Sequence, residues 1–377
     1  MERRSAYKNA GRHPHDFHIA TEDRYGMLHI EYLPFDVATD YLKGTHPRLL
    51  GVVGFPAVPE ECEADVPSAC VAAGSLRPGA RVPALCEVWA SQSPVRTGVD
   101  GAIQYAISGD FLFGVTTRPD GAGALRDLAE RAYGDIFSML ARRGFAHALR
   151  FWNYLPRINS EEGGVERYRL FNIGRGAAFE AAGLFRAESI PAACALGTDS
   201  GNALTVYFVA TRAAGRAVEN PRQVSAYHYP PEYGPRSPTF SRAVLYPADG
   251  ARMLFVSGTA SIVGHSTRHA GDVVAQTRET LANLEAVFTE AGRLSRPLAF
   301  AMREASYKVY LRRAADAETV RRELAVVLGE DADVNLLRAD ICRSDLLVEV
   351  EAIAYAGEPG AARPQGSDEG PGSAAGP

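Results

Sequence analysis

One order of strand and helix patterns occurs twice in this chain, and it constrains the fold more than any other feature. Each copy is predicted to run strand, strand, helix, strand, helix, strand, strand. The second copy comprises 251–264 (two strands about a glycine turn), 271–292 (helix), 301–311 (strand), 317–329 (helix), 332–341 (strand) and 346–354 (strand). The first copy comprises 105–118 (paired strands), 124–144 (helix), 147–158 (strand), 166–183 (helix) and 190–210 (two strands). The repeated order predicts two α+β units in a pseudo-symmetric pair, with mixed sheets packed against helices.

The duplication predicts how the chain is divided. The first unit, with an N-terminal extension, is expected at 1–215, and the second unit at 246–356. The segment 216–245 between them is proline-rich and aromatic, which favours an active-site loop over a plain linker. The stretch 357–377 is rich in Gly, Pro, Ala and Ser and is predicted to be disordered.

The charge and hydropathy of the chain argue against several classes of function. The net charge is −5 and no basic stripe occurs, so nucleic acid is not an expected partner. No apolar run approaches the ~18–20 residues of a membrane helix, and the charged N-terminus lacks the apolar run of a signal peptide. We therefore expect a cytoplasmic protein without a membrane partner.

Neither a metal nor an organic cofactor is expected. The five cysteines are widely spread without a CxxC pair, which argues against a disulfide framework and against a zinc site. His13, His15 and His18 resemble a metal-binding tract, but they lie in a polar terminal segment, which favours a frayed end. The chain has no GxGxxG after a strand, no GxxxxGK(S/T) and no HExxH.

The stretch LLVEVEAIA at 346–354 alternates strictly, so its successive side chains point to opposite faces of a strand. Leu347, Glu349 and Glu351 share one face. That face is either solvated, as is common for antiparallel strands, or it holds a carboxylic acid in a pocket. In the second case desolvation would raise the pKa of Glu349, so that it could act as a general acid. The spacing alone leaves both interpretations open.

Arginines lie near aromatic residues in the centre of the chain. Guanidinium groups bind carboxylates through two hydrogen bonds, so these arginines suit a small substrate with two carboxylates. The candidates are Arg157, Arg169, Arg175, Arg222 and Arg236. Each of them could equally lie on the surface.

A covalent nucleophile is only weakly indicated. Ser257 and Ser261 lie near His265, but no GxSxG elbow is present. Cys342 has an apolar neighbour in Ile341, which favours a small residue lining a pocket over a thiolate nucleophile.

Several motifs carry a family resemblance. FVSGTASIVG, the helix ending in TEAG and LLVEVEAIA resemble the RidA/YjgF family. RFWNYLPRIN, ERYRLFNIGR, ENPRQVSAYHYP, YGPRSPTFSRA and SGTASIVGH resemble the chorismatases, over roughly 149–354. The resemblance implies two RidA-like units with an active site between them under the long loop. It also implies cofactor-free cleavage of chorismate with release of pyruvate, by a monomer or a small homo-oligomer.

The resemblance also implies roles for particular residues. Glu349 matches the catalytic glutamate of the family and would protonate the methylene carbon of the enolpyruvyl group. The expected substrate-binding residues are Arg157 and Arg169 at the carboxylates, Gln223 and Tyr227 closing the pocket, and Tyr154, Tyr207, Gly258 and Cys342. The arginine of imine-deaminating RidA proteins has no counterpart near Val334, and Arg338 is out of register, which argues against imine deamination.

At Gly258 and Cys342 the chain resembles the family members that form 3-hydroxybenzoate. In the reaction of those members, the ring hydroxyl rather than water assists departure of the side chain. Formation of this aromatic acid for secondary metabolism is the expected function. Three alternatives stay open: hydrolysis to a dihydroxycyclohexadiene acid, release of 4-hydroxybenzoate, and a RidA-like module that binds a small molecule without catalysis.

Overall fold

The computed structural model describes residues 28–357, apart from 45, 63–64, 77–83, 122–124, 199–200 and 249–250. His13, His15, His18 and the predicted disordered tail beyond Gly357 lie outside the described residues. Among the helices of the described part, none is both long and apolar enough to cross a membrane.

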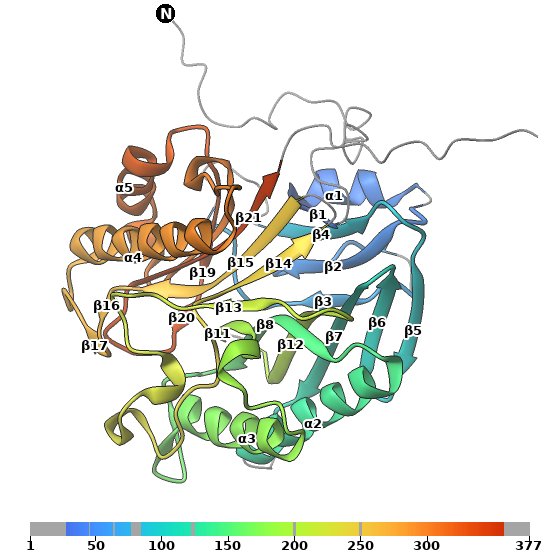
Figure 1. Cartoon of the computed structure of the whole chain (residues 1–377), viewed down its shortest axis with the longest axis horizontal. Helices are drawn as coiled ribbons and strands as arrows, with labels where there is room; N and C mark the ends of the chain where they lie inside the picture. Colours follow the sequence, from blue (N-terminus) through green and yellow to red (C-terminus); the bar gives the residue numbers. More distant parts are fainter. Residues whose placement is uncertain are drawn as a thin grey trace, which may run out of the picture.

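A seven-stranded sheet and two helices form the first α+β unit (Figure 1). Its elements are β5 Arg96–Asp100, β6 Ile103–Ser108, β7 Phe111–Pro119, α2 Leu125–Arg143, β8 His147–Pro156, α3 Arg167–Ala181, β11 Ala192–Thr198, β12 Ala203–Thr211 and β20 Asp340–Ile341. The strand order is β20-β11-β8-β12-β7-β6-β5. Only β8 and β11 pair in parallel.

A six-stranded sheet and two further helices form the second unit. Its elements are β13 Arg216–Val218, β14 Ala243–Ala248, β15 Ala251–Ala260, α4 Val273–Leu294, β18 Ser306–Leu311, α5 Ala317–Leu328, β19 Asp333–Arg338 and β21 Val348–Gly357. The strand order is β13-β14-β15-β21-β18-β19, and only β18 and β19 pair in parallel.

The two units share one topology. The first contains the run β6-β7-β12-β8-β11, and the second contains β14-β15-β21-β18-β19. In each run a hairpin comes first, and the last strand along the chain inserts between that hairpin and the parallel pair. The predicted α+β class, with two related units of mixed sheet and helices, is thereby confirmed. The domain boundaries at 215/216 and 245/246 stay a prediction.

A third sheet packs against the two units through a shared apolar core. The sequence patterns did not predict it. Its elements are β1 Leu28–Pro34, α1 Phe35–Leu42, β2 Leu49–Phe55, β3 Ser68–Cys70 and β4 Leu85–Ser91, in the strand order β1-β4-β2-β3. We call this part the N-terminal sheet. Helix α1 packs on its outer face through Ala38 and Leu42, and the inner face contributes Tyr32, Phe55 and Trp89 to the central core.

The three sheets enclose a common apolar core, and the helices lie outside it (Figure 1). Trp89 of β4, Trp152 of β8 and Phe255 of β15 all belong to this core. Helices α2 and α3 cover the outer face of the first unit, and α4 and α5 cover that of the second. Burial of apolar surface between these layers is therefore the main stabilising contribution to the paired arrangement.

Two predicted elements differ from the structure. The stretch 251–264 does not form a strand, a turn and a return strand, because β15 continues through Gly258 and pairs with the preceding β14. The pairing of β15 with β21 shifts register between Val256 and Thr259, which is a β-bulge. The predicted strand 332–341 is split, since β19 belongs to the second unit whereas β20 pairs with β11 of the first.

Candidate active site

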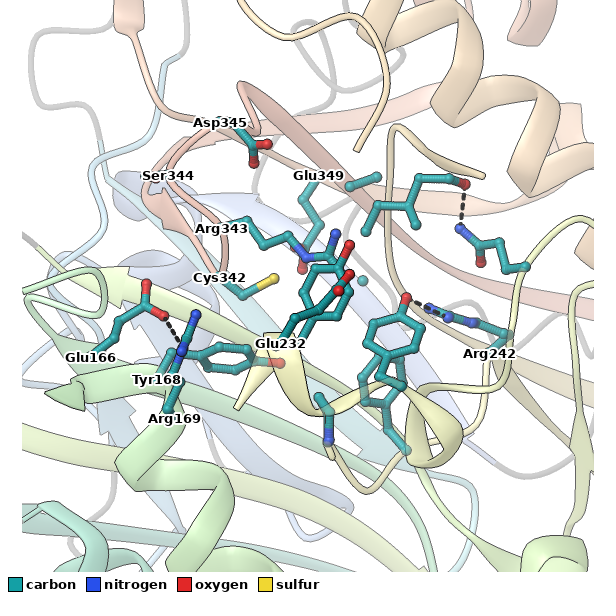
Figure 2. Close-up of a pocket in the computed structure, with 18 residues that line it drawn as sticks. Glu166, Tyr168, Arg169, Glu232, Arg242, Cys342, Arg343, Ser344, Asp345 and Glu349 are labelled. Carbon is teal, nitrogen blue, oxygen red and sulfur yellow. Dashed lines mark hydrogen bonds and ion pairs between the residues drawn. The ribbon is translucent and has the colours of Figure 1, made fainter. Parts of the chain in front are cut away.

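A cavity of about 270 Å³ opens where the two units meet (Figure 2). The start of α3, the segment 219–243, the end of β15 and the segment 342–345 all contribute to its wall. Its lining includes Tyr168, Arg169, Gln223, Tyr229, Glu232, Tyr233, Phe240, Arg242, Gly258, Cys342, Arg343 and Glu349. The cavity is therefore built from both copies of the duplication and from the long loop between them.

Glu349 lies at the inner end of this cavity, on β21 between β15 and β18. Glu349 is 3% exposed, and its carboxyl group has no hydrogen-bond or ion-pair partner among the described residues. Burial, and secondly the negative charge of Glu351, raises the pKa of Glu349 to about 8, against the opposing effect of Arg150. Glu349 is therefore mostly a neutral carboxylic acid at pH 7.

Gly258 makes room for this acid. A Cβ atom at position 258 would lie 1.9 Å from Oε1 of Glu349 and 3.1 Å from Cβ of Cys194. Gly258, the glycine of SGTAS, therefore allows the Glu349 side chain to approach the backbone of β15 at a bulge. It does not form the predicted turn.

Glu351, two residues further on the same face, has a different environment. It accepts a hydrogen bond from Trp152 Nε1 at 2.8 Å and pairs with Lys308 and Arg150. Burial opposes its ionisation, but the two cations outweigh that cost and hold the pKa of Glu351 below its usual value. Neither glutamate lies on a solvated face, so the alternative of a wet outer surface is wrong.

A smaller recess of about 30 Å³ continues from the cavity past Glu349. It has room for a small substituent and is lined in part by Arg175 and Asn172 of α3 and Cys194 of β11. Arg175 is 2% exposed, and its Nε and Nη2 have no hydrogen-bond partner among the described residues. Its guanidinium lies 5.1 Å from the ring centroids of both Tyr133 and Phe179.

Comparison with known proteins identifies the family. The family profile "Chorismatase FkbO/Hyg5-like, N-terminal" matches residues 87–210. The chain is 37% identical over 317 residues to a 3-hydroxybenzoate synthase of Streptomyces hygroscopicus, covering 81% of this chain and 91% of that protein. This chain belongs to the chorismatase family of enzymes.

Further relatives agree with this assignment. This chorismatase is 40% identical over 274 residues to a chorismatase of Streptomyces rapamycinicus, covering 71% of this chain and 81% of that protein. A crystal structure of a chorismatase matches with a TM-score of 0.76 at 32% identity, covering 87% of this chain and 98% of that one.

Five of the residues expected from the sequence line the cavity of this chorismatase. They are Arg169, Gln223, Gly258, Cys342 and Glu349. Desolvation raises the pKa of the Cys342 thiol to about 12, so it is not a thiolate at neutral pH. That value agrees with the interpretation of Cys342 as a small wall residue.

The structure places four other expected residues away from the cavity. Arg157 follows β8 in a turn, with its side chain 57% exposed and 3.6 Å from Asp120. Tyr154 and Tyr207 point into the core between the sheets, where the Tyr154 hydroxyl lies 2.8 Å from that of Tyr310. Tyr227 packs against Phe185 instead of the cavity. Side chains alternate across β8, and the face that carries Tyr154 packs into the core. The motif alone did not reveal which face of the strand meets the core.

Sequence reasoning missed several residues that line the cavity. Tyr229 and Tyr233 of the long loop take the place expected for Tyr227. Arg343 lies over the Tyr233 ring at 4.1 Å, and Arg242 Nη2 donates to the Tyr229 hydroxyl at 2.8 Å. Arg343 directly follows Cys342, so adjacency to a predicted wall residue was a usable signal.

Proposed function

We propose that this chorismatase converts chorismate to 3-hydroxybenzoate and pyruvate, with Glu349 as the proton donor. The observation that carries the proposal is a buried, neutral carboxyl group at the inner end of the cavity, with no hydrogen-bond or ion-pair partner among the described residues. The similarity to a 3-hydroxybenzoate synthase over most of both chains supports the choice of product.

The proposed reaction begins with transfer of the Glu349 proton to the methylene carbon of the enolpyruvyl group. The new C–H bond converts the enol ether into an oxocarbenium ion, and the carboxylate of Glu349 remains. The ether C–O bond to ring carbon 3 then breaks and the side chain leaves as pyruvate with the ether oxygen, while the oxygen of the neighbouring hydroxyl forms a bond to carbon 3. The bond of that oxygen to carbon 4 breaks as the ring becomes aromatic, which leaves the hydroxyl at the 3-position. One proton released during aromatisation restores the acid, so neither water nor an oxidant is consumed.

The cavity also supports a particular orientation of the substrate. In the enolpyruvyl group, the methylene and the carboxylate are attached to the same carbon atom. A cation beside Glu349 can therefore bind this carboxylate and present the methylene to the acid. We assign that position to Arg175, which lines the recess together with Glu349 and whose Nε and Nη2 have no hydrogen-bond partner among the described residues. We assign the ring carboxylate to Arg169 and Arg343, which line the wider cavity.

Isotope incorporation tests the proposed reaction directly. Pure protein is incubated with chorismate in D2O, and the products are separated by chromatography and examined by NMR. We expect 3-hydroxybenzoate and pyruvate in equal amounts, with one solvent deuterium in the pyruvate methyl group. A dihydroxycyclohexadiene acid would instead show that water is the attacking group, and the absence of pyruvate would contradict chorismate cleavage altogether.

The pH dependence should follow the ionisation of Glu349. Because the acid must be protonated to react, and its pKa is raised to about 8, activity is present below that pH and lost above it. We expect kcat/KM to be level up to about pH 8 and to fall about tenfold per unit beyond it. A fall beginning near pH 5 would contradict the assignment of Glu349 as the acid.

Replacing two wall residues should alter the product. In the variant Gly258→Ala/Cys342→Val, the added methyl group displaces the Glu349 carboxyl, and the larger side chain at 342 shifts the substrate. We expect a lower share of 3-hydroxybenzoate and the appearance of the diene acid, measured by chromatography. Gly134→Ala, whose Cβ would meet nothing within 4 Å, is the matched control and should change neither product nor rate. An unchanged product ratio in the double variant would refute this account of selectivity.

A further inference from the structure

A buried network of four charged side chains joins the three sheets. Glu87 of β4, Arg150 of β8, Lys308 of β18 and Glu351 of β21 are each at most 4% exposed. Lys308 Nζ lies 2.6 Å from Glu87 Oε2 and 2.8 Å from Glu351 Oε1, and Arg150 Nη2 lies 2.5 Å from Glu351 Oε2. The two acids and the two bases balance in charge, which is the condition under which buried ions are tolerated.

Glu351 is the most heavily bonded member of this network. Besides the two cations, it accepts hydrogen bonds from Trp152 Nε1 at 2.8 Å and from the Tyr310 hydroxyl at 3.2 Å. Donors to both carboxylate oxygens fix the orientation of the group and favour its ionised form. Glu351 is thus a permanent negative charge inside the molecule.

This charge faces the proposed acid. Glu349 and Glu351 are two residues apart on β21, so both side chains project from the same face of the strand. All the donors described above bind Glu351, and none binds Glu349. The other titratable or charged groups around Glu349 are Arg150, Tyr168, Arg175, Cys194, Tyr310, Cys342 and Arg343.

We propose that Glu351 is a positioning residue whose fixed negative charge keeps Glu349 in its neutral, proton-donating form, and that Lys308, itself paired with Glu87, keeps Glu351 ionised. The proposal rests on the proposed function, in which Glu349 is the acid. Two carboxyl groups on one face thereby take different roles, because their surroundings drive their ionisation in opposite directions. The negative charge of Glu351 raises the pKa of Glu349, as the proposal requires.

The network also gives the N-terminal sheet a part in catalysis. Glu87 is the member contributed by β4, and it accepts hydrogen bonds from Lys308, the Tyr207 hydroxyl and Trp89 Nε1. Its carboxylate lies 2.6 Å from Lys308 Nζ, so it helps to hold the cation that keeps Glu351 ionised. Docking of the N-terminal sheet therefore completes the electrostatic environment of the acid.

Opposite charge changes around Glu349 provide the test. Glu351→Gln removes the repelling charge, so the alkaline limit of kcat/KM should move down by about one to two pH units. Arg150→Met removes an attracting charge, so the limit should move up. Glu290→Gln, which removes a carboxylate paired with Arg293 on α4 and far from the network, is the matched control and should leave the limit unchanged. Shifts in the same direction for Glu351→Gln and Arg150→Met, or no shift for Glu351→Gln, would overturn the proposal.

A second measurement does not depend on turnover. The infrared band of the protonated Glu349 carboxyl, assigned by its loss in Glu349→Gln, is titrated in each variant without substrate. Its midpoint should move down in Glu351→Gln and up in Arg150→Met. If Glu349→Gln retained activity, the proposed function would be wrong. The titration would still measure whether the charges of the network shift the ionisation of Glu349. An unmoved midpoint in both charge variants would refute the network even if Glu349 is the acid.

Glu87→Gln tests the contribution of the N-terminal sheet. This variant removes one negative charge from the network without touching Glu351, so the midpoint should move down, by less than in Glu351→Gln. A midpoint equal to that of the unmodified protein would show that the N-terminal sheet has no electrostatic role.

Discussion

Replacing Glu349 by glutamine should lower kcat for pyruvate release by about 10²–10⁴-fold, the range that general acid catalysis contributes. The amide is nearly isosteric with the buried carboxyl group but cannot give up a proton to carbon. KM should change little, because the proposed site binds the carboxylates of the substrate through arginines and not through Glu349. Steady-state assays of pyruvate and of the aromatic product measure both constants.

Thermal unfolding serves as the control for this variant. The native pKa of Glu349 is raised from 4.5 to about 8, so the native state binds a proton that the unfolded state has released between these pH values. The ionisable group therefore reduces stability progressively as pH rises from about 4.5 to 8. Glu349→Gln should unfold at an equal or higher temperature than the unmodified protein at pH 8. Near-normal turnover in this variant would contradict the role of Glu349.

Replacing Arg175 by methionine should lower kcat/KM for chorismate by about 10–100-fold. Hydrogen bonds to charged groups contribute about 1.5–3 kcal/mol, and this variant removes those that we assign to the enolpyruvyl carboxylate. Methionine keeps an unbranched apolar stem among the rings of Tyr133, Phe151 and Phe179, so packing is largely retained. Initial rates over a range of chorismate concentrations measure the effect.

Arg157→Met is the matched control, because the sequence motifs and the structure disagree about this arginine. Arg157 was expected at a substrate carboxylate, yet its side chain is 57% exposed and pairs with Asp120. We expect its replacement to leave KM and kcat unchanged. A large rise in KM for Arg157→Met, with none for Arg175→Met, would restore the sequence-based interpretation and refute the assignment of Arg175.

Local patterns predicted most of the two α+β units. Helix α2 was expected at 124–144 and is found at Leu125–Arg143, and α5 was expected at 317–329 and is found at Ala317–Leu328. Periodic apolar residues and glycine stops specify such elements within one stretch of chain. The N-terminal sheet was not predicted, because no repeat or family motif marked its short strands.

Long-range packing decided which predicted site residues reach the cavity. Tyr227 and Tyr229 are two residues apart in one loop, yet only Tyr229 lines the cavity. An irregular loop has no fixed periodicity, so the direction of its side chains depends on what the loop packs against. The glycine at 258 was predicted as part of the site, but its physical reason, the approach of Glu349 from β21, required the paired strands.

The two glutamates of LLVEVEAIA show most clearly which features follow from the sequence and which depend on the tertiary structure. Alternation along the strand determined from sequence alone that Glu349 and Glu351 share a face. Only the tertiary structure decided that this face is buried and that the two carboxyl groups differ. The partners Arg150 and Trp152 lie 201 and 199 residues away from Glu351 in the chain. Ionisation depends on charges and burial in space, and folding brings these together from three separate sheets.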